Sequence, residues 1–146
     1  MSKIVVGVDG SEQAHHALRW ALAQAQAHGS ELVVVHVSLA GVPLSHVGEL
    51  ARLQEVARQR GEQTVSDALD KAGATRYDVP IRPTILWDMQ PASALIDEAQ
   101  SADLLVVGSR GLGGFRGMLL GSVSQHCVHH APCPVVVVRS SEPARR

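Results

Sequence analysis

The sequence predicts a single α/β domain in which a doubly wound, five-stranded parallel sheet carries helices on both faces. Five short apolar runs rich in β-branched residues alternate with segments of helical periodicity, and this alternation is typical of a parallel sheet. The run at 32–37 is apolar apart from His36, which is the pattern of a strand covered on both faces. The length of 146 residues fits one domain that buries roughly 70% of the surface of its unfolded chain.

The first half of the chain is predicted to hold two strand–helix units. A β-branched run at residues 4–8 indicates the first strand. Ser11 is a suitable N-cap for the next helix, whose apolar residues recur at three- and four-residue spacing until Gly29. The second strand is expected at 32–37, and a loop separates it from a long helix at about 48–72.

The second half is predicted to add three strands and two helices. The third strand is expected at 80–86, and Pro91 is well placed as the first residue of the helix that follows it. The fourth strand is expected at 104–107, a short last helix at 122–130 and the fifth strand at 135–138.

The most informative segment is 103–124, DLLVVGSRGLGGFRGMLLGSVS, in which a buried strand runs directly into a glycine-rich loop. Five glycines lie between 108 and 117, and Gly121 precedes the last predicted helix. Glycine can adopt positive φ and turn its N–H groups toward an anion, and a helix N-terminus adds further N–H groups and a positive dipole end. The segment therefore predicts phosphate binding, and the expected ligand is a nucleotide.

Two common nucleotide signatures do not describe this loop. A Walker A loop needs a lysine after its last glycine, but Lys3 and Lys71 are the only lysines of the chain and neither is near a glycine cluster. A dinucleotide fingerprint that starts at Gly111 and Gly113 fails because its last glycine position holds Arg116.

The residues instead spell Gly108-x2-Gly111-x9-Gly121-Ser122, which resembles the ATP-binding branch of the universal stress protein family. KIVVGVDGS, ELVVVHV and APCPVVVV are similar to the first, second and last strand regions of that family. The resemblance implies a universal stress protein domain at 1–139, and 140–146 is expected to be a disordered tail. One departure is Met89-Gln90-Pro91, where relatives often carry Gly-x-Pro.

The resemblance implies the strand order 3-2-1-4-5 and a Rossmann-like fold of the HUP type. Ligand sites in such sheets lie beyond the carboxyl ends of the strands, where the strand order reverses. The loops that begin at Asp9 and Gly108 would then converge on one crevice. The implied function is that of a nucleotide-dependent regulator or sensor in stress response, with ATP and Mg²⁺ as cofactors and at most slow ATP hydrolysis.

The predicted nucleotide-binding residues follow the first, second and fourth strands or begin the last helix. They are Val8, Asp9, Gly10, Ser11, Val37, Gly108, Ser109, Arg110, Gly111, Gly121, Ser122, Val123 and Ser124. Asp9 can accept hydrogen bonds from a ribose or help to hold Mg²⁺. The resemblance implies that the backbone of Val37 contacts adenine, while its side chain is expected in the core.

Several of these residues also have a purely structural interpretation. Asp9, Gly10 and Ser11 can form a strand-to-helix turn with its cap. Arg110 and Arg116 can clamp phosphate oxygens or remain solvated. Ser122 and Ser124 can cap the last helix, which is compatible with phosphate binding.

Two alternative functions remain open. One is a sensor whose ligand is AMP or cyclic AMP, because a glycine loop does not determine the number of phosphates. The other is an ATPase or nucleotidyl-transfer enzyme, but fast phosphoryl transfer needs a base or water-positioning residue that the loop region does not supply. No catalytic residue is therefore predicted.

Composition narrows the expected partners and location. The net charge is −1 with both signs interspersed, so no basic face predicts nucleic-acid binding. The longest apolar runs are about five residues, whereas a membrane span needs roughly 20. With no signal-peptide pattern, the expected location is the cytoplasm.

Three further features of the sequence allow predictions. His126 to Cys133 contains three histidines and two cysteines, but no second ligand pair completes a zinc site, and Cys127 is expected in the core. Trp20 and Trp87 are expected to be packing residues. The four valines at 135–138 would form an apolar edge strand, which predicts a homodimer joined through that strand.

Overall fold

The computed structural model describes residues 1–39, 49–110 and 120–139 and contains one parallel sheet of five strands in the order β3-β2-β1-β4-β5. The fold class and the strand order are those predicted. The elements are β1 (Lys3–Gly7), α1 (Glu12–His28), β2 (Glu31–Leu39), α2 (Leu50–Ala72), η2 (Ala74–Arg76), β3 (Ile81–Asp88), α3 (Pro91–Glu98), η3 (Ala99–Ser101), β4 (Leu104–Gly108), α4 (Ser122–His130) and β5 (Val135–Val138). Gly111, Arg116 and the expected tail at 140–146 lie outside the described residues.

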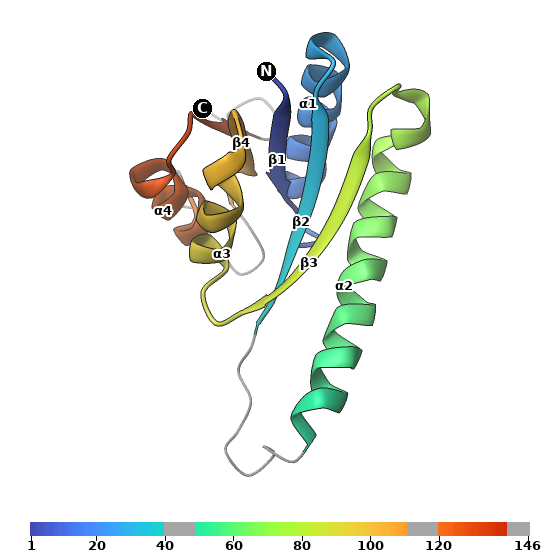
Figure 1. Ribbon diagram of the computed structural model, residues 1–146, viewed down its shortest axis with the longest axis vertical. Coiled ribbons are helices and arrows are strands. Elements are labelled where there is room, and N and C mark those ends of the chain that lie inside the picture. Colours follow the sequence, from blue (N-terminus) through green and yellow to red (C-terminus); the bar gives the residue numbers. More distant parts are fainter. Residues whose placement is uncertain (40–48, 111–119, 140–146) are drawn as a thin grey trace, which may run out of the picture.

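The helices cover the sheet in two layers, with α1 and α2 on one face and α3 and α4 on the other. Figure 1 shows α3 and α4 on the left of the sheet and α2 on the right. Alternate residues of the strands point to opposite faces, so Ile4 and Val6 pack with α1 and α2 while Val5 packs with α3 and α4. Both faces of β1 are fully buried, which is why its sequence is continuously apolar.

Helix α1 begins and ends at the residues that the sequence indicates. The hydroxyl of Ser11 accepts a hydrogen bond from the Ala14 N–H, and Gly29 follows the helix with φ of 64° in the left-handed region. Gly73 ends α2 in the same way. Both glycines are at positions where a residue with a Cβ would be strained.

Strand bounds differ from the predicted ones by one or two residues. β1 occupies 3–7 rather than 4–8, and β4 reaches Gly108. The larger difference is at β2 and β3, which remain paired as far as Leu39 and Asp88, two residues beyond the predicted ends. The apolar runs stop earlier than the hydrogen-bonded ladder, because the ladder needs only backbone groups.

Helix ends also differ from the prediction. α2 begins at Leu50 rather than near residue 48, and Glu49 before it makes no side-chain capping bond. α3 ends at Glu98, and the chain then forms one 3₁₀ turn over Ala99–Ser101 before β4. Ala99, the first residue of this turn, is fully buried.

Gly61 allows α2 to lie unusually close to the sheet. A Cβ at this position would be 2.7 Å from Cγ2 of Ile85 and 3.0 Å from Cδ2 of His36. Gly61 is buried in the middle of α2, where glycine has poor helix propensity. Close packing on β2 and β3 is therefore the physical reason for a glycine here.

The N-terminal residues are attached to the start of β4 by one carboxylate. Oδ2 of Asp103 accepts hydrogen bonds from the backbone N–H groups of Ser2 (2.7 Å) and Lys3 (3.0 Å). These bonds hold the pKa of Asp103 below its ordinary value, with the Lys3 amide as the largest cause. They fix the beginning of β1 beside β4.

None of the helices in the described parts of the chain is both long and apolar enough to cross a bilayer.

Candidate functional site

The predicted site residues gather where β1 and β4 end next to each other. β1 pairs directly with β4, with Val6 opposite Val106, so the loops that follow leave the sheet side by side. The strand order also reverses here, because β1 connects through α1 to β2 on one side while β4 leads to β5 on the other. This is the position at which parallel α/β sheets bind ligands.

Gly108 lies directly against the first turn of α1. A Cβ on Gly108 would be 2.9 Å from the carbonyl carbon and 3.0 Å from the carbonyl oxygen of Gln13. These are backbone atoms, which cannot move aside as a flexible side chain can. Gly108 is thus required for α1 to approach the end of β4, whatever else it does.

Ser109 connects three elements through hydrogen bonds. Its N–H donates to the Val138 carbonyl in β5 (2.9 Å), and its hydroxyl donates to Oε1 of Gln13 in α1 (3.1 Å). Its carbonyl accepts from the Gly121 N–H (2.6 Å) and from the Ser124 hydroxyl (2.9 Å) at the start of α4. We call the bonds from Ser109 to Gln13, Gly121 and Ser124 the Ser109 clasp.

The start of α4 has no side chain that caps it among the described residues. Gly121 is the N-cap and has no side chain, and the Ser124 hydroxyl, which also reaches the Gly121 carbonyl at 3.1 Å, points back into the protein. Gly121 and Ser124 are buried, whereas Ser122 is exposed. The amides of the first turn consequently form an N-terminus of the kind that attracts anions.

The turn after β1 has the structural role that was one of its two interpretations. Oδ1 of Asp9 accepts a hydrogen bond from the Ser11 N–H (2.9 Å), and Gly10 has φ of 87°, which favours glycine. Ser11 then caps α1. The turn places the half-buried Asp9 carboxylate at the end of β1, beside the loop that leaves β4.

His36 and Gln13 contact residues of the predicted site through hydrogen bonds that the sequence did not reveal. Nδ1 of His36 is 2.9 Å from the carbonyl oxygen of Val8, so this nitrogen carries the hydrogen and donates it. The N–H of Val8 also donates to the Val35 carbonyl (2.8 Å), so hydrogen bonding to β2 continues one residue beyond the end of β1. Neither His36 nor Gln13 belongs to a motif, and their partners are 28 and 96 residues away in the sequence.

The remaining predicted residues have varied positions. The side chain of Val37 packs against the core between the sheet and α3 and α4, as expected for a core residue. Arg110 is half-buried at the last described position before residue 111. The structure therefore brings the residues around Asp9, Gly108 and Gly121 together at the carboxyl ends of β1 and β4. Gly111 is outside the described residues and cannot be placed with them.

Titratable groups near the crevice are sparse in the described chain. His15, in the first half of α1, has a pKa below its ordinary value, mainly because of partial burial and then because of the positive charges of Lys71 and Arg19. No group of three or more histidine, cysteine, aspartate or glutamate side chains in 1–39, 49–110 and 120–139 is placed to hold a metal ion.

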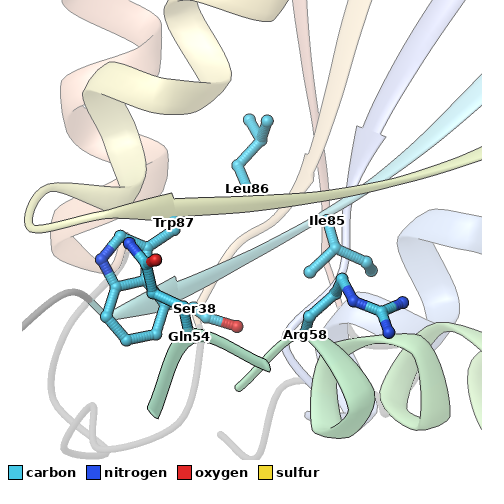
Figure 2. A pocket seen from close by; sticks show the side chains of 6 residues that line it. All are labelled: Ser38, Gln54, Arg58, Ile85, Leu86 and Trp87. Carbon is cyan, nitrogen blue, oxygen red and sulfur yellow. The ribbon is translucent and has the colours of Figure 1, made fainter. Parts of the chain in front are cut away.

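A separate pocket of about 180 Å³ lies between α2 and the ends of β2 and β3. Figure 2 shows Ser38, Gln54, Arg58, Ile85 and Trp87 on the α2 side of β3 and Leu86 pointing to the opposite side. The guanidinium of Arg58 is already paired with Glu55 and Glu62 on the same helix. Trp87 lines this pocket, whereas no predicted nucleotide-binding residue does.

Known proteins resemble this chain along nearly its whole length. The model of the universal stress protein family matches residues 1–139. A universal stress protein of Thermus aquaticus is 39% identical over 140 residues, which cover 93% of this chain and 97% of that protein. One from Mycobacterium tuberculosis is 39% identical over 146 residues, but the chain spans only 45% of that longer relative.

Solved structures agree with this relation. The universal stress protein UspA from Lactobacillus plantarum has the same fold, with a TM-score of 0.81 at 24% identity over 94% of this chain and 97% of that one. A universal stress protein described in complex with cAMP is 29% identical, with a TM-score of 0.66 over 96% of this chain and 98% of that one. The agreement of family model, sequence relatives and fold over the same residues means that the chain belongs to the universal stress protein family.

Proposed function

We propose that this protein binds an adenine nucleotide, ATP with Mg²⁺, in the crevice between the Asp9 turn and the Ser109 clasp, and acts as a nucleotide-dependent regulator. The carrying observation is that the clasp fixes the start of α4, with its uncapped first-turn amides, beside the turn that holds Asp9. An anion-binding helix end and a carboxylate then face the same crevice. A nucleotide has the matching chemistry, with phosphates at one end and ribose hydroxyls further along.

The role proposed for each residue depends on whether its polar groups already make hydrogen bonds within the protein. The amides of Ser122 and Val123 and the hydroxyl of Ser122 would bind phosphate oxygens, because no side chain in the described residues caps them. The carboxylate of Asp9 would accept hydrogen bonds from the ribose, or it would coordinate Mg²⁺ together with the phosphates. Mg²⁺ is commonly held by one or two carboxylates together with substrate phosphates. Ser109 and Ser124 would hold these groups in place through the clasp.

A ligand with a single phosphate is the second candidate. It is favoured by the 29% identical universal stress protein described in complex with cAMP. The same helix end would bind its phosphate, and the two candidates differ in the number of phosphates that the ligand carries. For the ATP candidate we propose at most slow hydrolysis, because no base or water-positioning residue is predicted at the site.

The test is to purify the protein without added nucleotide, denature it and identify released ligand by chromatography and mass. ATP is the expected ligand, whereas AMP or cyclic AMP would favour the second candidate. Added ATP and Mg²⁺ should also raise the melting temperature by several degrees, since a hundredfold excess over Kd adds about 2.7 kcal/mol. The proposal would be overturned if the purified protein released no nucleotide and if millimolar ATP, AMP and cyclic AMP all left the melting temperature unchanged.

The variant Gly121→Val tests where the phosphates bind. A β-branched side chain beside the first-turn amides should reduce nucleotide affinity at least about tenfold, which is about 1.4 kcal/mol. Isothermal titration calorimetry measures the affinity, and circular dichroism verifies the native fold. Ala23→Val, which also introduces a valine but on the exposed part of α1, is the control and should bind as the wild type does. Retained affinity in Gly121→Val would place the phosphates elsewhere.

A further inference from the structure

Helix α4 carries three exposed histidines at its carboxyl end, and two of them face each other. The ring centroids of His126 and His130 are 4.6 Å apart, with an angle of 43° between the ring planes. The ring of His129 is farther away, with its centroid 6.3 Å from that of His130. We propose that His126 and His130 form a binding site for one divalent transition-metal ion, with Cu²⁺ bound most tightly.

The spacing of the two histidines suits chelation. Residues four apart on a helix are neighbours on one face, and the H-E-x-x-H zinc motif uses this same spacing to bring two imidazoles to one ion. Both side chains are exposed, so an ion can reach them without any opening of the fold. The helix backbone already holds the two imidazoles close to each other. Chelation of an ion therefore costs less conformational entropy.

The ligand set determines which ions are expected. No group of three or more potential ligands exists among the described residues, so the protein supplies two nitrogens and water completes the coordination. Imidazole favours copper, nickel and zinc, whereas Mg²⁺ and Ca²⁺ prefer oxygen ligands. Among these the general order of affinity places Cu²⁺ first. The proposed site would therefore not compete with the crevice for Mg²⁺.

Cys127 is excluded as a third ligand by its position. Its side chain is fully buried in the core between the sheet and α3 and α4, between two exposed neighbours on the same helix. The site thus remains a two-histidine site.

The end of the helix on which the site lies also favours a cation. His129 and His130 belong to the last turn of α4, where the carbonyl ends of the helix dipole attract positive charge. α4 has only nine residues, a length at which an isolated helix is marginal in water. An ion that bridges His126 and His130 would join one turn of this short helix and stabilise it.

Calorimetric titration of the full chain with Cu²⁺ and with Ni²⁺, in a buffer that does not bind metals, tests the proposal. The wild type should bind one ion per chain, and His126→Ala and His130→Ala should each reduce the affinity roughly tenfold or more. His28→Ala is the matched control, because His28 is exposed in the last turn of α1 without a histidine four residues away. It should bind as the wild type does.

Electron paramagnetic resonance of the Cu²⁺ complex gives a second measurement that a general loss of stability would not imitate. The wild type should show coupling to two imidazole nitrogens, and each single variant to one. His129→Ala should change the affinity by less than about threefold. Wild-type affinity in His126→Ala or His130→Ala would overturn the proposal, and so would a tenfold loss in His129→Ala, which would move the site to a different pair.

Discussion

Ser109 is predicted to bind nucleotide, and in the structure its polar groups hold the fold together. Its amide, carbonyl and hydroxyl each have a partner in β5, α4 or α1, and the residue is only 4% exposed. Ser124 is similarly buried, and its hydroxyl lies within hydrogen-bonding distance of two carbonyls. For both residues, a role in binding would consist mainly of positioning the amides at the start of α4.

Replacing Ser124 with alanine should lower the free energy of unfolding by about 1 kcal/mol. The Ser109 carbonyl would keep its bond from Gly121 but lose the one from the buried hydroxyl, and a net hydrogen bond is worth about that amount. Urea denaturation measures the change. Ser122→Ala is the control on the same turn, because Ser122 is exposed and should change stability by less than about 0.5 kcal/mol. Equal effects of the two variants would contradict the clasp.

The lowered pKa of Asp103 predicts that this residue contributes to stability in a way that depends on pH. Its folded-state pKa is lowered, chiefly by the amide of Lys3, so the carboxylate stabilises the fold above its ordinary pKa of about 4. This contribution is lost as the pH falls through the lowered folded-state value. Asp103→Asn should therefore melt below the wild type at pH 7, and the difference should shrink below pH of about 4.

Thermal melts of both proteins between pH 7 and pH 3 measure this effect. Asp97→Asn is the control, since Asp97 is exposed on α3 and makes none of the bonds to the N-terminal residues. The difference in melting temperature between Asp97→Asn and the wild type should not change with pH in the same way. A difference between Asp103→Asn and the wild type that stays constant with pH would show that the carboxylate charge is not involved.

At the scale of elements, α2 shows how one residue determines the distance between a helix and the sheet. Gly61→Ala would gain up to about 1 kcal/mol of helix propensity. The added methyl, however, would be 2.7 Å from Cγ2 of Ile85, and a β-branched side chain has little freedom to move. Overpacking costs about 1–3 kcal/mol, so we expect the variant to be less stable than the wild type.

Urea denaturation again gives the measurement for Gly61→Ala. Ser66→Ala lies on the exposed side of the same helix and should be neutral or slightly stabilising, because only helix propensity changes there. If Gly61→Ala were as stable as Ser66→Ala, close contact between α2 and β3 would not be the reason for the glycine.

Most of the elements could be predicted because their patterns are local. The period of α1, its Ser11 cap and Gly29 were enough to locate the helix, and buried strands such as β1 and β4 are evident as apolar runs. The ends of β2 and β3 were predicted two residues short, because the ladder continues through Ser38 and Asp88, which apolarity does not indicate. The strand order came from resemblance rather than from periodicity.

The candidate site could be predicted only as a set of loops. The glycine spacing indicates which segments meet, but not which hydrogen bonds they form. Gln13 and His36 contribute through contacts with Ser109 and Val8 that are distant in sequence, so no local pattern reveals them. Whether the predicted residues bind nucleotide stays a prediction for the experiments above.

At the scale of the whole molecule, the two edges of the sheet differ. The β3 edge contains exposed Arg82 and Pro83, features that discourage pairing with another strand. The β5 edge consists of four half-buried valines. The carbonyls of Pro134 and Val138 bond to β4, so alternation along the strand directs the N–H of Val137 to the open edge.

We therefore expect a homodimer in which two copies of β5 pair antiparallel about a twofold axis. Val137→Pro would remove an outward N–H and leave the bonds to β4 intact, so it should give monomers in light-scattering chromatography at tens of micromolar. Val137→Ala is the matched control, because it also loses apolar contacts but keeps the N–H. A wild-type monomer under these conditions, or a dimer of Val137→Pro, would disprove this assembly.

The Ser109 clasp has a further consequence for how this fold can change. It joins residue 109 to residues 121 and 124, so the chain between them starts and ends at points held by the sheet and α4. Because the scaffold holds both ends of this segment, doubling its length would add only about 0.6 kcal/mol to the entropic cost of loop closure. We therefore expect segments of other lengths between residues 109 and 121 to change the free energy of unfolding little, which urea denaturation of insertion variants can measure.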